Sequence, residues 1–184
     1  MEKIVIAAFA GSLRKDSLNK AIINTAKKYA PENIEINVLD LNGIPLYNQD
    51  EEGSMPESVR NFKNALTGAD AILIATPEYN RSIPGVLKNA IDWASRPYGN
   101  NSFDDKPVAT IGASGGAIIG TAVAQYHLRQ IFSFLNAHPL ERPQVFIGGA
   151  GEKVENGLFI DEDTVTLIKD LVEKLAAWAV RLGK

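Results

Sequence analysis

Runs of apolar residues divide the chain into regular segments and predict the strands of a sheet. The runs lie at residues 4–10, 34–41, 71–75, 108–113 and 145–147. Four of them are nearly continuous in Ile, Val, Ala and Phe, which is typical of parallel strands that helices cover on both faces. The second run instead alternates, because Glu35 and Asn37 separate Ile34, Ile36 and Val38. We therefore expect that strand to be partly solvated and to lie at an edge of the sheet.

Segments of helical length and period separate these runs. They begin near Ser17, Pro56, Pro84, Ile118 and Asp163. Ser54 and Glu57 have the spacing of a capping box around Pro56, which predicts a helix start. The last segment, residues 165–182, repeats apolar residues at helical spacing and predicts a helix against the sheet, with Trp178 in the core. A short strand at residues 158–160 is expected before it.

The alternation of strand and helix predicts the fold class. Right-handed crossovers lead to an α/β fold with a doubly wound five-stranded parallel sheet, strand order 2-1-3-4-5, and helices on both faces. Residues 1–184 contain no repeat or linker, so one domain is expected. In such sheets ligands bind at the carboxyl ends of the strands, beside the point where the strand order reverses. The loops after the first, third and fourth strands are therefore the candidate site.

The loop after the first strand has the composition of a phosphate site. Ser12, Ser17 and Asn19 offer neutral donors, Arg14 adds a cation, and the loop ends where a helix begins. A nucleotide triphosphate loop is disfavoured because Asp16 stands where its second glycine is required, and the glycines of a dinucleotide fingerprint are missing as well. The alternative is an ordinary polar turn with a serine cap.

The loop after the third strand suits a flat heterocycle such as a flavin. Pro77 and Pro84 stiffen its two ends, and Tyr79 and Asn80 lie between them. Backbone N–H and C=O groups can meet the polar edge of a ring, while the aromatic side chain forms a wall. The alternative is a rigid connection with a surface tyrosine.

Residues 112–116 match the Gly-x-Ser-x-Gly pattern of serine hydrolases. That fold needs an acidic residue and then a histidine after the serine, but no acidic residue separates Ser114 from His138, the last histidine. A hydrolase is therefore disfavoured, and small residues there would instead let a cofactor approach the backbone. We expect His127 to be a packing or interface residue and His138 to lie in a loop.

Composition excludes further classes. The chain has no cysteine and two histidines, so no metal site is expected. Its 19 basic and 22 acidic residues give a formal net charge of -3, which favours neither nucleic acid nor a membrane surface as a partner. The first apolar run is too short to insert into a membrane, and we expect a cytoplasmic protein. Glu51 and Glu52, beside Asp50, are interpreted as a solvated charge run.

Two motifs together resemble the NADPH-dependent FMN reductase family, which includes chromate and quinone reductases and has a flavodoxin-like fold. They are Gly11-Ser12-Leu13-Arg14 with Ser17-Leu18-Asn19, and Pro77-Glu78-Tyr79-Asn80-x-Ser82-x-Pro84-Gly85. Residues 92–97 and 125–130 extend the likeness, which covers essentially the whole chain.

The resemblance implies roles for particular residues. The FMN phosphate would be held by Ser12, Arg14, Ser17, Leu18 and Asn19. The ribityl chain and ring would be lined by Pro77, Glu78, Tyr79, Asn80 and Ile83, with Ser114 and Gly115 on the far side of the ring. Arg96, together with Arg81, would receive NADPH or NADH. No side chain need be catalytic, because the flavin carries the chemistry.

The expected function is an NAD(P)H-dependent, FMN-containing oxidoreductase. It would pass electrons by a ping-pong mechanism to quinones, free flavin, chromate or similar small acceptors. The apolar segment at residues 118–137 has more apolar surface than one sheet face needs, so we expect a homodimer or homotetramer. Two alternatives remain, namely a flavodoxin-type electron carrier and a non-catalytic FMN-binding module.

Overall fold

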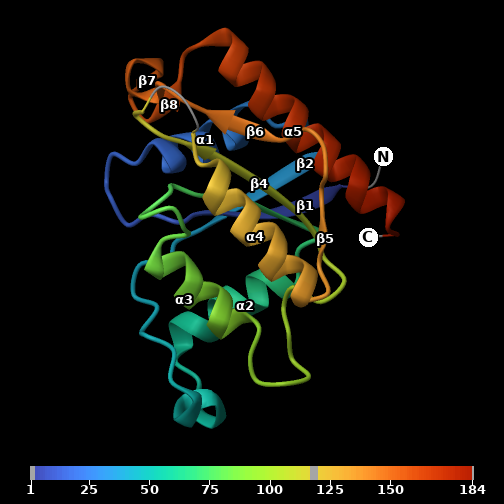
Figure 1. Ribbon diagram of the computed structural model, residues 1–184. Helices are drawn as coiled ribbons and strands as arrows, with labels where there is room; N and C mark the ends of the chain where they lie inside the picture. Colours follow the sequence, from blue (N-terminus) through green and yellow to red (C-terminus); the bar gives the residue numbers. More distant parts are fainter. Residues whose placement is uncertain (1–2, 117–119, 184) are drawn as a thin grey trace.

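A parallel sheet forms the centre of the molecule in the computed structural model, which describes residues 3–116 and 120–183 (Figure 1). Its strand order is β2-β1-β3-β4-β5, and β6 pairs with β4 further along. The strands are β1 (Ile4–Ala10), β2 (Ile34–Leu39), β3 (Ala71–Ala75), β4 (Pro107–Ala113), β5 (His138–Pro139) and β6 (Val145–Ile147). All pairs within this sheet are parallel, as predicted.

The fifth position of the sheet is filled by two short strands. His138 pairs with Pro107 at one end of β4, and Val145 pairs with Ile111 near the other. The prediction that His138 lies in a loop is therefore wrong. The apolar pattern missed β5 because it contains a proline, which a sheet tolerates only at an edge such as this one.

Burial along the strands follows their positions in the sheet. Every residue of β3 is buried between its two neighbours. The prediction of an edge position for β2 is confirmed, and Val38 is 41% exposed there. Alternate residues of β1 face opposite sides, so Ile6 and Ala8 join one apolar cluster while Ala7 and Phe9 join the other.

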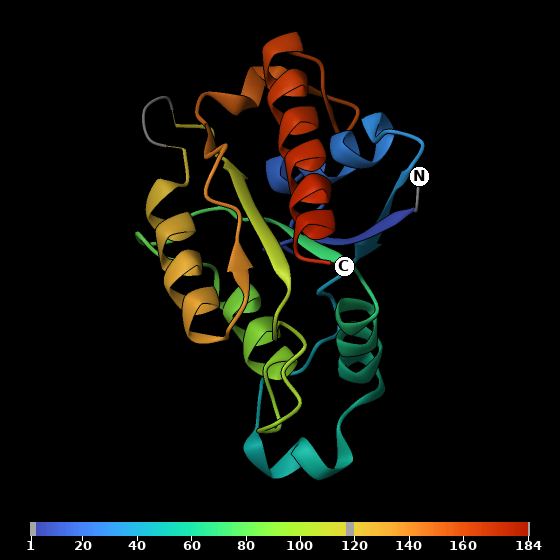
Figure 2. The same ribbon diagram turned by 90° about the vertical axis from the view of Figure 1, so that its right-hand side faces the viewer.

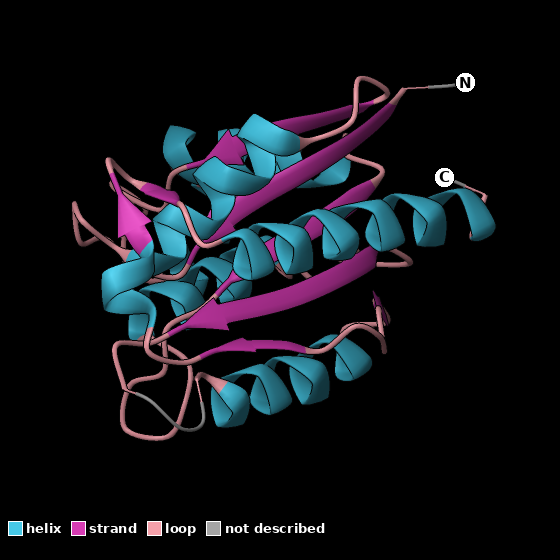
Figure 3. Ribbon diagram, turned by 90° about the horizontal axis from the view of Figure 1, so that it is seen from above, coloured by secondary structure: helices cyan, strands magenta, loops and turns pink. Residues whose placement is uncertain are grey.

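Helices cover both faces of the sheet (Figures 2 and 3). Helices α1 (Leu18–Tyr29) and α5 (Glu162–Arg181) pack on the face of Ile6. Helices α2 (Glu57–Thr67), α3 (Gly85–Ala94) and α4 (Ala122–Phe134) pack on the face of Phe9. Within the described residues no helix is both long and apolar enough to cross a bilayer.

Two predicted helix starts differ from the structure. The capping box is wrong, since Ser54 ends the 3-10 helix η1 (Gln49–Ser54) and Pro56 is the N-cap of α2 without a side-chain hydrogen bond. The residue before a proline avoids the helical conformation, so the backbone of Met55 (φ -48°, ψ 130°) is not helical and separates Ser54 from α2. The start predicted near Ile118 lies outside the described residues, and α4 begins at Ala122.

A small hairpin precedes the last helix. After the short helix η2 (Ala150–Lys153), strands β7 (Val154–Glu155) and β8 (Leu158–Phe159) pair antiparallel, so a strand near residues 158–160 is confirmed. Asp161 caps α5 by accepting a hydrogen bond from the Thr164 amide at 3.0 Å. Trp178 is only half-buried, and its indole N–H donates to the His138 carbonyl at 3.2 Å.

Candidate functional site

The loop after β1 is held in place by its own serines. Ser12 and Ser17 are buried, although Arg14 between them is exposed. Ser12 Oγ accepts from the Arg14 amide at 3.3 Å, and Ser17 Oγ accepts from the amides of Asn19 and Lys20 at the start of α1. The loop therefore presents hydroxyls, one exposed cation and a capped helix N-terminus in one place.

Asn19 joins this loop to the end of β4. Its side-chain amide donates to the Ala113 carbonyl and accepts from the Ala113 amide, both at 3.0 Å. The carboxamide thus uses its oxygen and one of its two N–H donors on Ala113. These two hydrogen bonds hold the first turn of α1 against the carboxyl end of β4.

The carboxylate of Glu78, in the loop after β3, is hydrogen-bonded to the first turn of α4. Glu78 Oε2 accepts hydrogen bonds from the amides of Val123 and Ala124, at 3.0 and 3.1 Å, in the first turn of α4. Glu78 also lines the candidate site, together with Pro77 and Tyr79. The carboxylate therefore connects the loop after β3 to the start of α4.

The three loops line one hollow of about 210 Å³ at the carboxyl ends of β1, β3 and β4. In Figure 1 the loops after β1 and β3 lie at the left-hand edge of the sheet. The lining residues are Ser12, Arg14, Ser17, Leu18, Asn19, Pro77, Glu78, Tyr79, Ala113, Ser114 and Gly115. All of these except Ala113 are predicted site residues, and Ala113, the last residue of β4, was recognisable only as the end of an apolar run.

The remaining predicted ring residues lie outside this hollow. Asn80 and Arg81 form the exposed tip of the loop after β3. Ile83 is partly buried against the apolar cluster on the α2, α3 and α4 face. Its side chain therefore packs the loop against the core.

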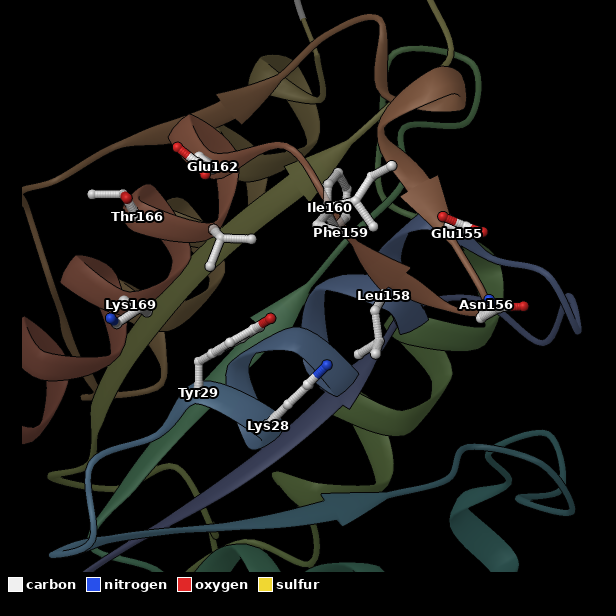
Figure 4. Close-up of a pocket in the computed structure, with 11 residues that line it drawn as sticks. Lys28, Tyr29, Glu155, Asn156, Leu158, Phe159, Ile160, Glu162, Thr166 and Lys169 are labelled. Atoms are coloured by element: carbon white, nitrogen blue, oxygen red, sulfur yellow. The ribbon is translucent and has the colours of Figure 1, made fainter.

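A second hollow, of about 640 Å³, lies elsewhere, between the end of α1, the β7–β8 hairpin and the start of α5 (Figure 4). In the view of Figure 4, Lys169 borders it on the left, Tyr29 and Lys28 below, and Leu158 on the right. None of the predicted site residues lines it. Although this hollow is larger than the one between the three loops, we do not take it as the candidate site.

Arg96 is not part of the hollow, because α3 separates the two. The loop 77–84 precedes this ten-residue helix and Arg96 follows it, a distance of about 15 Å along the helix axis. Its Nε donates to Glu52 at 2.7 Å, and its guanidinium lies 4.1 Å from the centre of the Tyr98 ring. Within one chain the structure does not bring Arg96 to the other predicted residues.

The prediction that Glu52 belongs to a solvated charge run is wrong, because its side chain is mostly buried and hydrogen-bonded. Its side chain is 15% exposed, and besides Arg96 it accepts a hydrogen bond from the Tyr47 hydroxyl at 2.6 Å. The Tyr47 hydroxyl and then Arg96 lower the pKa of Glu52. Sequence spacing gave no signal of this pairing, because 44 residues separate Glu52 from Arg96.

Lys63, on α2, connects that helix to the end of α3 and to the loop that follows α3. Its buried ammonium donates to the carbonyls of Ala94 and Asn100, both at 2.8 Å. A cation is favourable at the end of α3, where the helix leaves unpaired carbonyls. Desolvation nevertheless lowers the pKa of Lys63 from 10.5 to about 8, against the opposing effect of Glu52.

This pKa predicts how stability changes in alkaline solution. Between pH 8 and 10.5 the unfolded chain holds a proton on Lys63 that the folded chain lacks, so the contribution of Lys63 to stability rises with pH. We expect the free energy of unfolding of the wild type, relative to Lys63→Met, to increase across that range. Urea titrations followed by circular dichroism at several pH values measure it. A difference that stays flat or falls would contradict the lowered pKa.

Ser114 lacks the partners of a hydrolase nucleophile. Its hydroxyl donates to the Gly116 carbonyl at 3.1 Å. His127 lies 3.1 Å from Ser82 and His138 lies 2.6 Å from Asp105, so both histidines are engaged elsewhere. Among the described residues, no group of three or more His, Asp or Glu side chains is arranged to hold a metal ion.

Comparison with known proteins decides the family. Residues 4–152 match the family described as NADPH-dependent FMN reductase. The chain belongs to the NADPH-dependent FMN reductase family. The resemblance inferred from the motifs at residues 11–19 and 77–85 is thereby confirmed, and so is the prediction of a flavin oxidoreductase at the level of the family.

Relatives of this family match the chain over nearly its full length. A 2-hydroxy-1,4-benzoquinone reductase of a Burkholderia species is 45% identical and covers 94% of each chain. An NAD(P)H-dependent FMN reductase of Pseudomonas aeruginosa is 44% identical and covers 98% of each. The solved structure of FerB, a flavoenzyme NAD(P)H:acceptor oxidoreductase of Paracoccus denitrificans, is 39% identical with a TM-score of 0.89, covering 97% of this chain and 98% of its own. The predicted fold is thus confirmed.

Proposed function

We propose that this FMN reductase family member binds FMN between the loops after β1, β3 and β4 and catalyses the NAD(P)H-dependent reduction of small acceptors. The acceptors would be quinones, free flavin, chromate or similar molecules, and residues 1–184 would act as one domain. One observation carries the proposal. The two separated motifs that predicted a phosphate site and a ring site line a single hollow with the end of β4.

The residues present fit the phosphate of FMN. A phosphomonoester has about two negative charges and three acceptor oxygens, and the hollow offers the buried hydroxyls of Ser12 and Ser17, the N-terminus of α1 and Arg14. Arg14 is exposed, so it can turn toward an anion at little cost in desolvation. Leu18 and Asn19 would contribute from the first turn of α1.

The ring would lie between the loops after β3 and β4. Pro77, Glu78 and Tyr79 would line one side with backbone groups and the half-exposed tyrosine ring, and Ser114 and Gly115 the other. A Cβ on Gly115 would meet none of the described residues within 4 Å, which leaves room for a ligand beside the backbone there. When bound, FMN would accept hydride from NAD(P)H and reduce the acceptor, and alternate occupation of one open site would give ping-pong kinetics.

The hollow is smaller than the 300–1,000 Å³ typical of sites that enclose a ligand. A flavin seated there would keep part of its ring outside the chain, where nicotinamide, acceptor or a second copy can approach. Arg81, which is exposed in the loop after β3, would receive the nicotinamide cofactor. Arg96 would contribute only by reaching the site of a second copy.

We therefore keep the proposal of a homodimer or homotetramer with the cofactor near the interface. Phe134 on α4 is 85% exposed, Tyr98 beside Arg96 is 87% exposed, and Leu46 is 84% exposed. Such side chains would mark an interaction surface where they join into a contiguous patch. Native mass spectrometry is expected to give a multiple of 19.9 kDa, and a monomer alone would contradict the proposal.

The catalytic proposal is tested on the purified protein, which we expect in the cytoplasmic fraction of the cell. Addition of FMN should give a bound flavin spectrum, and excess NADPH or NADH with a quinone should then be consumed steadily. An electron carrier would bind FMN without steady oxidation of NAD(P)H, and a non-catalytic module would not turn over with any acceptor. Absence of FMN binding would refute all three.

A further inference from the structure

The loop that would frame the flavin ring contains an unfavourable turn. Tyr79 and Ser82 close it with backbone hydrogen bonds of 2.9 Å in both directions. The two residues between them, Asn80 and Arg81, have φ angles of 51° and 61°. This left-handed region suits glycine and, to a lesser degree, asparagine, so Arg81 is strained there. Such a conformation persists only where its surroundings hold it.

Two side-chain contacts tie the turn to α4, one on each side of the strained pair. Before the pair, the Glu78 carboxylate accepts from two amides at the start of α4, and the side chain is only 10% exposed. The side chain of Thr121, the N-cap of α4, does not cap the amides of the first turn, so Glu78 performs that function from another loop. After the pair, Ser82 Oγ lies 3.1 Å from Nδ1 of His127.

The two ties reach neighbouring turns of one helix. Ala124 and His127 are three residues apart, so they lie on the same side of α4. Figure 1 shows the start of α4 beside the loop. Because α4 packs on the sheet through Leu128 and Phe132, both ties connect the loop to the core.

We infer that His127, acting through Ser82, is a positioning residue that holds the loop 77–84 in the shape required to bind FMN. This rests on the proposed FMN site and adds two residues to it, since neither Ser82 nor His127 lines the hollow. Removing the contact frees the strained turn to relax in the absence of ligand. FMN must then restore the bound shape, so part of its binding free energy is lost.

The contact is tested by FMN titration of the flavin-free protein, followed by flavin fluorescence. Ser82→Ala and His127→Leu are each expected to raise the Kd for FMN about three- to tenfold, the effect of one net hydrogen bond. Because both variants break the same contact, the double variant should bind no more weakly than the weaker single one. Ser82→Thr, which keeps the hydroxyl, and His127→Asn, whose amide can occupy the position of Nδ1, should recover most of the affinity.

His138→Ala is the matched control, because this histidine pairs with Asp105 and lies away from the hollow. It should leave the Kd unchanged, whereas a purely structural role of His127 would lower the melting temperature without changing the Kd of the folded protein. Unchanged affinity in Ser82→Ala would overturn the inference, and this variant remains a test if His127→Leu fails to fold. Additive effects in the double variant would overturn the inference as well. A wild type that binds no FMN would instead overturn the proposed function, and the inference with it.

Discussion

Replacing Gly112 with alanine is expected to lower the free energy of unfolding by about 3 kcal/mol, at the upper end of the usual cost of overpacking. Gly112 lies in β4, where an added Cβ would be 1.8 Å from Thr121 Oγ1 and 2.3 Å from the Thr76 carbonyl oxygen. Both threonines are fully buried. The Thr121 hydroxyl is also fixed by Gln125, which donates to it at 3.1 Å, so neither neighbour can move cheaply.

Gly116→Ala provides the matched control within the same Gly-x-Ser-x-Gly pattern. Among the residues that the structure describes, its added Cβ would meet only Ser114 Oγ, at 3.9 Å, an ordinary contact. Urea unfolding of the flavin-free proteins, followed by circular dichroism, should show a large shift of the midpoint for Gly112→Ala and little for Gly116→Ala. Equal midpoints for the two variants would mean that β4 and the start of α4 do not approach as closely as described. The glycine of the apparent hydrolase pattern thus serves the close packing of strand and helix.

Replacing Arg14 with alanine is expected to raise the Kd for FMN about 10- to 100-fold, the range for loss of charge-assisted hydrogen bonds. The guanidinium is exposed and donates to the Asp16 carbonyl within its own loop. It lines the hollow together with the buried hydroxyls of Ser12 and Ser17. Turnover at saturating FMN should change less than the affinity, because Arg14 would contact the phosphate and not the ring.

Lys15→Ala removes the same charge one residue away. Lys15 borders neighbouring hollows and does not line the candidate site. It should therefore weaken binding only through the general field, an effect that about 0.15 M salt largely screens. If Arg14→Ala and Lys15→Ala weakened FMN binding equally, the assignment of Arg14 to the phosphate would be wrong.

Much of the site followed from local patterns. Continuous apolar runs such as residues 71–75 could only be strands buried on both faces, and the alternation around Ile36 marked an edge strand. Once the strand order is known, the carboxyl ends of β1 and β3 must be neighbours, so motifs about sixty residues apart had to meet. The position of the hollow was therefore predictable.

The amino-acid sequence by itself determined the order of strands and helices, the face that each buries and the loops that form the site, because these depend on hydrophobic periodicity and chain connectivity. Only the tertiary structure decided what the polar side chains contact. Glu52 bonds Arg96, Glu78 caps α4 and Ser82 meets His127 across separations of 44 or more residues. No local period encodes such pairs, since hydrogen bonds depend on distances of about 3 Å that arise only when packed elements meet.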